Sequence, residues 1–164
     1  MTLVLRAETL TDCDAVAAMH MLAWQVGYRG MLPDDFLAGL DVDQWADRRR
    51  KLLDTRPALV AERHGEIVGF TRFGPGREDE TVGEIQAMYV HPDHWGMGIG
   101  DALMCTALDG LPQNEVQLWV LERNERALRF YARYGFHPDG TRSTYRPRGT
   151  EIEAPDIRCT LRRL

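Results

Sequence analysis

The sequence has few cysteines, no surplus of positive charge and no long hydrophobic run at its amino terminus. Its three cysteines are an odd number without a CxxC spacing, which argues against a disulfide framework or zinc site and favours a reducing cytoplasm. The net charge is −5, whereas nucleic-acid binding needs clustered Lys and Arg. The segment MTLVLRAETLTD contains a charged residue by position 6, so we expect neither a signal peptide nor a membrane span. These features predict a cytoplasmic protein with no nucleic-acid or membrane partner.

Histidine is also sparse and gives no metal-binding pattern. Only His91 and His94 are close in sequence, and Pro92 between them disfavours a helix that would bring both onto one metal ion. We therefore predict no metal. Basic residues cluster twice: the first cluster, at 48–51, is typical of a solvated helix face, whereas the second (Arg123, Arg126, Arg129 and Arg133) could mark a local anion site.

The length and composition suit one domain with one hydrophobic core. The chain has 164 residues, of which 44% are hydrophobic, enough to bury a sizeable core. No internal repeat, low-complexity segment or linker interrupts it. We expect a single domain over residues 1–164.

Hydrophobic periodicity predicts alternating strands and helices, a mixed α/β protein. Expected strands are LVLRAE, ALVAERHG, EIVGFTRFG, EIQAMYV, EVQLWVLE, RSTYRP and IRCTLRRL, with a hairpin turn at His64–Gly65. Expected helices are TDCDAVAAMHMLAWQVGYRG, a two-piece region LPDDFLAGL and DVDQWADRRRKLLD, then GDALMCTALDGL and NERALRFYARYG. Thr11 with Asp14 is spaced as a capping box for the first helix, and Asp41 is the expected N-cap of DVDQWADRRRKLLD.

Three glycines, Gly96, Gly98 and Gly100, stand at alternate positions between a predicted strand and a predicted helix. Glycine loses more backbone entropy on folding than any other residue, so this density needs a reason. A loop without side chains that enters a helix presents unpaired N–H groups to phosphate oxygens. The spacing differs from the G-x-G-x-x-G dinucleotide fingerprint. We predict a pyrophosphate-binding loop; the alternative is a flexible turn with incidental glycines.

Two segments carry a resemblance to a known family. YVHPDHWGMGIGDALM resembles the acetyl-coenzyme A motif of GNAT-type N-acetyltransferases, and NERALRFYARYGF resembles that family's second signature. The order of the predicted elements matches over essentially the whole chain. Trp95 departs from the Gln or Arg usual before the first glycine, and Asp101 is less expected near phosphate than a neutral or basic residue.

The resemblance implies a fold and a cofactor site. The fold would be a central mixed sheet of six to seven strands with a splayed parallel pair, flanked by about four helices. Acetyl-coenzyme A, used without a metal, would insert between the splayed strands Glu84–Val90 and Val116–Leu121, and an N–H near Met88 or Val90 would serve as an oxyanion donor. The implied cofactor contacts are Met88, Tyr89, Val90, Trp95, Gly96, Met97, Gly98, Ile99, Gly100, Asp101, Asn124 and Tyr131. For Asn124, the alternative is a role as helix cap only.

The resemblance also implies two catalytic residues for acetyl transfer to an amine. Tyr131 lies seven residues after Asn124, on the same side of the helix, where a phenol can protonate the departing thiolate; a core aromatic is the alternative. Glu84 would deprotonate the amine through water, and a surface glutamate is the alternative. His91 and His94 are substitute proton acceptors.

The acceptor side is less specific. By family analogy Trp24 and Tyr28 line the acceptor pocket, although such an aromatic pair also suits a core. The expected function is N-acetylation of a small-molecule amine or a protein amino terminus, with a homodimer as a possible assembly. The alternative is a module that binds acyl-coenzyme A without turnover.

Overall fold

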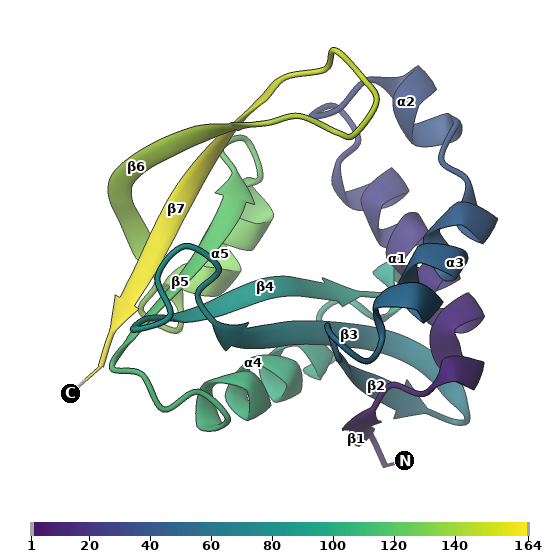
Figure 1. Ribbon diagram of the computed structural model, residues 1–164, viewed down its shortest axis with the longest axis horizontal. Helices are drawn as coiled ribbons and strands as arrows, with labels where there is room; N and C mark the ends of the chain where they lie inside the picture. Colours follow the sequence, from purple (N-terminus) through teal and green to yellow (C-terminus); the bar gives the residue numbers. More distant parts are fainter. Residues whose placement is uncertain (1, 164) are drawn as a thin grey trace.

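The computed structural model describes residues 2–163, which form a seven-stranded mixed sheet with helices on both faces (Figure 1). The strand order is β1-β2-β3-β4-β5-β7-β6. The strands are β1 Val4–Ala7, β2 Leu59–Arg63, β3 Glu66–Pro75, β4 Gly83–Val90, β5 Glu115–Leu121, β6 His137–Tyr145 and β7 Ala154–Arg162. The helices are α1 Cys13–Gly27, α2 Asp34–Ala38, α3 Val42–Leu52, α4 Ile99–Asp109 and α5 Glu125–Ala132, with short 3₁₀ helices η1 Leu10–Asp12 and η2 Pro92–His94. The predicted mixed α/β fold is confirmed.

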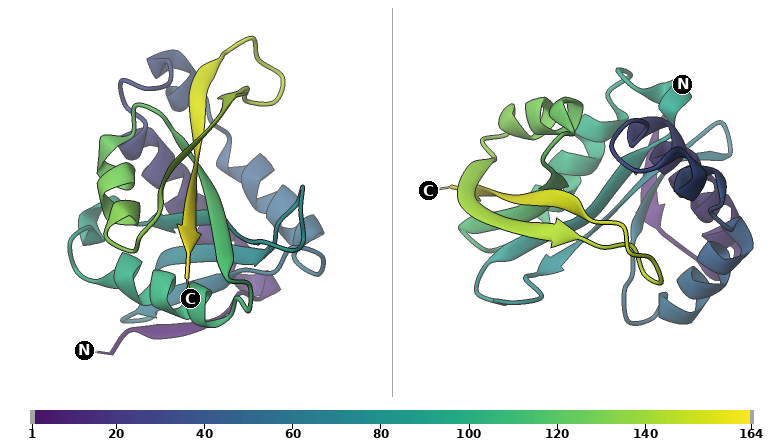
Figure 2. Two further views of the ribbon diagram at one scale, coloured as in Figure 1. Left: turned by 90° about the vertical axis from the view of Figure 1, so that its left-hand side faces the viewer. Right: turned by 90° about the horizontal axis from the view of Figure 1, so that it is seen from above.

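The sheet divides where its one parallel pair separates. Strands β4 and β5 are paired only at Gly83 with Val116 and at Glu84 with Gln117, although both strands continue beyond these residues. Beyond that point β4 stays with β2 and β3, whereas β5 turns away with β6 and β7 (Figures 1 and 2). The predicted splayed pair is therefore confirmed. Between positions 85 and 90, the edge of β4 that faces β5 carries main-chain groups that β5 does not pair.

Each half of the sheet is held by its own helix packing. On one side Val16 of α1 packs against Val60 and Phe70 of β2 and β3, all fully buried. On the other, Met104 of α4 and Leu118 of β5 lie in a second buried cluster. Each half of the sheet therefore has its own buried cluster. No helix within residues 2–163 has the length and apolar character needed to cross a membrane.

Two local predictions are confirmed. The hairpin turn between β2 and β3 has positive φ at both His64 (55°) and Gly65 (78°), the geometry of a type I′ turn. The side chain of Asp41 caps α3 by accepting the N–H groups of Asp43 and Gln44 at 3.0 and 3.2 Å.

The predicted start of the first helix is wrong. The capping box is formed by Thr9 and Asp12 at η1, with the Thr9 N–H 2.8 Å from the Asp12 carboxylate, instead of by Thr11 and Asp14. The two pairs have the same spacing, so the sequence pattern alone did not distinguish them. A turn of 3₁₀ helix therefore precedes α1, and its N-cap, Thr9, lies two residues before the predicted N-cap Thr11.

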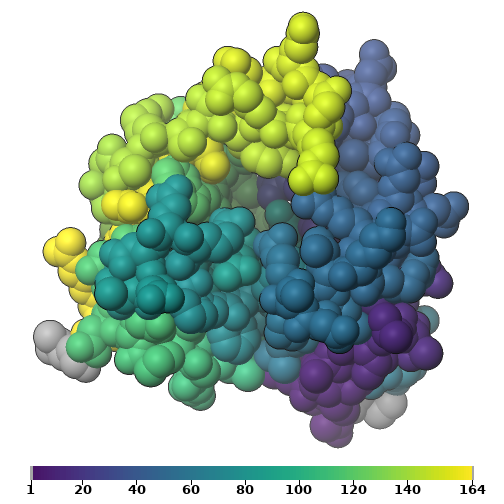
Figure 3. Space-filling view, viewed as in Figure 1, coloured from purple at the N-terminus to yellow at the C-terminus, as the bar shows by residue number. Residues whose placement is uncertain are grey.

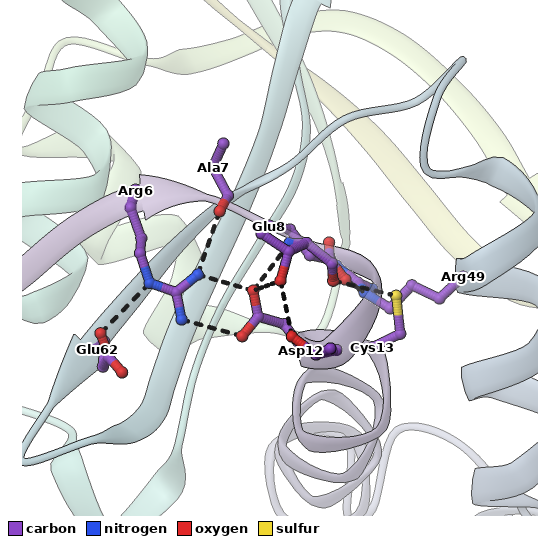
Figure 4. A network of polar contacts seen from close by, with 9 residues as sticks. Arg6, Ala7, Glu8, Asp12, Cys13, Arg49 and Glu62 are labelled. Carbon is purple, nitrogen blue, oxygen red and sulfur yellow. Dashed lines mark hydrogen bonds and ion pairs between the residues drawn. The ribbon is translucent and has the colours of Figure 1, made fainter.

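A buried ion pair joins the end of β1 to α3 (Figure 4). The Arg49 guanidinium donates to both carboxylate oxygens of Glu8, at 2.6 and 3.0 Å, and the Glu8 side chain is 0% exposed. Beside it, Arg6 bonds both Asp12 and Glu62. Breaking a buried pair costs more than the pair contributes, because the remaining charge loses its partner.

Replacing Glu8 with alanine should lower the free energy of unfolding by about 3–5 kcal/mol, because Arg49 would stay buried without a counter-charge. Urea denaturation measures this loss. The matched control is Glu125→Ala, whose partner Arg129 lies 3.9 Å away with both side chains more than 70% exposed; there we expect a change of at most about 1 kcal/mol. A similarly small loss for Glu8→Ala would contradict a structural role for the buried pair.

Candidate active site

A cavity of about 960 Å³ opens where β4 and β5 separate. Its walls come from the end of α1, the β3–β4 loop, β4, the glycine loop before α4, β5, the start of α5, and strands β6 and β7. In the space-filling view a hollow lies between the β3–β4 segment, the α3 segment and the segment that joins β6 to β7 (Figure 3). A cavity of this size holds a substantial ligand, and the predicted site residues can be placed against it.

The three glycines of the loop do different things. Gly96 and Gly98 have φ of 77° and 83°, which disfavours other residues, and a Cβ on either would meet no atom within 4 Å. Gly98 is the N-cap of α4, so the free N–H groups of that helix follow it directly. A Cβ on Gly100 would lie 3.2 Å from the ring of Phe130, so this glycine allows α4 and α5 to approach closely. The loop thus offers open backbone at the positive end of a helix dipole.

Met97 and Ile99, two predicted cofactor contacts, do not place their side chains in the cavity. Met97 is 54% exposed at the surface, and Ile99 is 1% exposed in the core beneath β2 and β3. A cofactor contact at Ile99 would therefore come from the main chain.

Trp95, at the position before the first glycine, contacts both the end of β4 and α5. Its indole N–H donates to the carbonyl of Val90 at 2.9 Å, and the guanidinium of Arg126 lies 3.6 Å from its ring centroid. The guanidinium over the ring is a cation–π contact, and it puts a positive charge from α5 beside the loop. Sequence reasoning did not assign Arg126; the basic cluster that contains it was the available signal.

Asp101 lies in the first turn of α4, where a carboxylate would oppose a phosphate. It accepts a hydrogen bond from the hydroxyl of Tyr134 and lies 3.1 Å from the guanidinium of Arg133. Burial and the bond to Asp101 raise the pKa of Tyr134, so its hydroxyl stays protonated. The guanidinium of Arg133 therefore offsets the negative charge of Asp101, and the Tyr134 hydroxyl adds a neutral hydrogen bond.

Tyr131 lines the cavity from α5. Burial raises the pKa of its phenol above the ordinary value, so the group is protonated at neutral pH. Its ring also packs against the core cluster that contains Phe136, 6.2 Å away between centroids. Its hydroxyl has no hydrogen bond to any residue between 2 and 163. The side chain therefore combines a packed ring with a free donor at the cavity wall.

Asn124 is buried at the start of α5 and also lines the cavity. Its side-chain oxygen accepts the N–H of Ala127 at 3.2 Å, which confirms the predicted helix cap. Its amide group keeps two donors. The cofactor contact stays a prediction.

Glu84 begins the splayed stretch of β4 and lines the cavity. It is 6% exposed, so it is not a surface glutamate. Arg77 of the β3–β4 loop holds it: the Arg77 N–H donates at 3.0 Å and its guanidinium at 2.6 Å. Sequence reasoning missed Arg77.

The two aromatic residues predicted for the acceptor pocket line the cavity near the end of α1. The rings of Trp24 and Tyr28 meet edge to face at 5.1 Å, and the hydroxyls of Tyr28 and Tyr89 are 2.9 Å apart. Both rings also pack against a buried cluster that contains Leu32 and Leu121. They therefore belong to the core and to the cavity wall together.

The paired histidines lie beside the glycine loop. His91 caps η2 by accepting the N–H of Asp93 on Nδ1 at 3.1 Å, and His94 lines the cavity. Within residues 2–163 no group of three or more His, Cys, Asp or Glu side chains is arranged to hold a metal ion.

Two further residues of the cavity wall were not predicted. Tyr145 of β6 and Asp156 of β7 both face the cavity. The sequence patterns that resemble the family end at residue 136, so no motif pointed to these strands.

Comparison with known proteins identifies the family. The model of the Acetyltransferase (GNAT) family matches residues 15–136, and the chain therefore belongs to that family. "Probable N-acetyltransferase Rv2775" of Mycobacterium tuberculosis is 32% identical over 148 residues, covering 87% of this chain and 84% of that protein.

Solved structures share the fold at low identity. The PaiA N-acetyltransferase of Thermoplasma acidophilum, solved with coenzyme A, has a TM-score of 0.72 at 17% identity and covers 99% of both chains. YncA of Salmonella typhimurium, solved with acetyl-CoA, has a TM-score of 0.67 at 21% identity, over 99% of this chain and 94% of that one.

Proposed function

We propose that the protein transfers the acetyl group of acetyl-coenzyme A to a primary amine, either of a small molecule or of a protein amino terminus. The observation that carries the proposal is the cavity itself. It joins the glycine loop, the unpaired edge of β4, a protonated phenol and an aromatic end in one continuous space. Membership of the acetyltransferase family supports the same reaction.

The residues present fit acetyl-coenzyme A as the acyl donor. The open positions beside Gly96 and Gly98 and the N-terminus of α4 suit a pyrophosphate, with Arg126 as an added positive charge. The unpaired edge of β4 around Met88 and Val90 suits the amide groups of the pantetheine arm, and Asn124 keeps amide donors for it. The indole of Trp95 already donates to the Val90 carbonyl, which keeps one lone pair for a further donor.

The chemistry needs a neutral amine, a polarised carbonyl and a proton for the departing sulfur. Glu84, acting through water, is the proposed proton acceptor for the ammonium. A main-chain N–H near Met88 or Val90 would stabilise the negative charge that develops on the carbonyl oxygen. As the C–N bond forms and the C–S bond breaks, the sulfur leaves with the electron pair and takes a proton from Tyr131. The nitrogen then loses its extra proton through water, and this proton restores the Tyr131 phenol.

Release of free thiol from acetyl-coenzyme A in the presence of a panel of amines tests the function. Acceptor-dependent release, with the acetylated amine identified by mass spectrometry, is the expected result. Tight coenzyme A binding with no release for any acceptor would contradict it and favour a non-catalytic acyl-coenzyme A-binding module.

Replacing Glu84 with glutamine should lower the rate of acetyl transfer most at neutral pH. Part of the loss should return at higher pH, where more of the amine is already neutral, so the pH–rate profile is the measurement. Glu80→Gln is the matched control, because Glu80 is exposed in the same β3–β4 loop. A profile for Glu84→Gln that follows that of the control would remove Glu84 as the base.

A further inference from the structure

We propose that Asp156 binds the ammonium group of the acceptor at the aromatic end of the cavity, so that the acceptor is a primary amine with an apolar body and no carboxylate. This inference rests on the proposed function, since it names the acceptor class for the same cavity. It assigns a role to a strand, β7, that carries none of the family's sequence patterns.

Strand register places Asp156 on the cavity face. It lies opposite Leu121 of β5 and opposite Ser143 of β6. Because side chains alternate along a strand, Ser143 and Tyr145 share one face of β6, and Asp156 shares that face on β7. All three line the cavity, and Tyr145 is therefore a near neighbour of Asp156.

Asp156 has no partner of its own. Of the other carboxylates that line the cavity, Glu84 is held by Arg77, Asp101 by Arg133 and Asp79 by Thr81, whereas Glu78 is exposed to solvent. The side chain of Asp156 makes no hydrogen bond or ion pair with any residue from 2 to 163, although it is half-buried. Burial raises its pKa to about 6, so it is largely ionised at neutral pH. A partly buried carboxylate without a partner is costly, and a bound cation would remove that cost.

The wall around Asp156 suits a cation and an apolar body. Tyr145 and Trp24 approach edge to face at 6.0 Å, and the rings of Tyr28 and Tyr89 continue the wall. Burial is the main cause that raises the pKa of Tyr89, and the nearby charge of Asp156 raises it further. Aromatic faces attract ammonium groups, and their edges pack against apolar groups.

The cavity offers no free guanidinium, among residues 2–163, to a carboxylate on the acceptor. Its arginines are engaged: Arg77 by Glu84, Arg133 by Asp101, and Arg126 on the ring of Trp95 beside the glycine loop. An amino acid would bring its carboxylate close to Asp156, where like charges repel. Amines such as 2-phenylethylamine, tyramine and hexylamine lack that charge.

Calorimetry with the protein saturated with coenzyme A tests the inference without turnover. We expect 2-phenylethylamine, tyramine or hexylamine to bind, and phenylalanine to bind at least tenfold more weakly than 2-phenylethylamine. Asp156→Asn should weaken amine binding by about 10- to 100-fold, the scale of a hydrogen bond to a charged group. Glu153→Gln is the matched control, because it removes the same charge from an exposed residue near the start of β7 and should change little.

Steady-state kinetics distinguish a role of Asp156 in binding the amine from a purely structural role. Asp156→Asn should raise KM for the amine by a similar factor and leave KM for acetyl-coenzyme A within about twofold. Absence of amine binding to the parental protein, equal binding by Asp156→Asn, or a preference for phenylalanine would each overturn the inference. Amine binding that depends on Asp156, but without any acetyl transfer, would support the inference and contradict the proposed function.

Discussion

Replacing Tyr131 with phenylalanine should lower turnover by roughly 10- to 10⁴-fold, the scale of general-acid catalysis, with coenzyme A affinity nearly unchanged. The ring packs against the core and stays in place, so only the hydroxyl at the cavity wall is lost. Burial keeps the phenol protonated at neutral pH, and without it the thiolate must leave unprotonated or take a proton from water. The measurement is kcat under conditions where chemistry limits the rate, together with the Kd for coenzyme A.

Tyr134→Phe is the matched control for the loss of a hydroxyl. Tyr134 lies three residues further on and donates its hydroxyl to Asp101. Its removal should have a small effect on turnover and a modest one on stability, because a hydrogen bond to a charged group is lost. If Tyr131→Phe keeps parental turnover while chemistry limits the rate, Tyr131 serves packing alone.

Features set by neighbouring residues were predictable from the sequence. The turn at His64–Gly65 and the caps Asp41 and Asn124 depend on contacts within three residues, and the structure confirms all three. The glycine loop is similar, because a strand, three glycines and a helix follow one another directly. The splayed strands were predictable only through the resemblance to a family, since no local pattern encodes the separation of two strands.

Partners that meet across the fold were not predictable. Arg126 covers Trp95 from a helix 31 positions away, and the sequence does not say which face of α5 meets the loop. Arg77 reaches Glu84 because the β3–β4 connection folds back on itself. Both contacts change the chemistry of the site. The contact of Arg126 with Trp95 adds a cation near the glycine loop, and the contact of Arg77 with Glu84 gives the predicted base a hydrogen-bonded partner.

At the aromatic end of the cavity, strand register decides whether Tyr145 and Asp156 face the cavity. A register shift in β6, between Pro138 and Arg142, resets the alternation of side chains before Tyr145. A shift of one residue would turn Tyr145 away from the cavity. Hydrophobic periodicity therefore could not place Tyr145 and Asp156 on the same face.

Replacing Gly98 with valine should abolish coenzyme A binding in a protein that remains folded. The position beside Gly98 is open, so a Cβ would meet no protein atom and would instead occupy the space proposed for the pyrophosphate. At a φ of 83° a β-branched residue is also strained, which would turn the N–H groups of the loop away from the phosphates. Losing one or two charge-assisted hydrogen bonds weakens affinity by about 100-fold or more.

Gly65→Val separates backbone strain from loss of the site. Gly65 has a φ of 78° and likewise has no atom within 4 Å of a Cβ, but it lies in the β2–β3 turn. Both variants should lose comparable thermal stability, because the strain is comparable, and only Gly98→Val should lose coenzyme A binding. Calorimetry with coenzyme A measures affinity, and the Tm of each unliganded variant reports folding. The side chain of valine would block any ligand oxygen from the backbone at position 98. If a folded Gly98→Val protein kept the parental affinity for coenzyme A, the pyrophosphate would therefore not bind at the glycine loop.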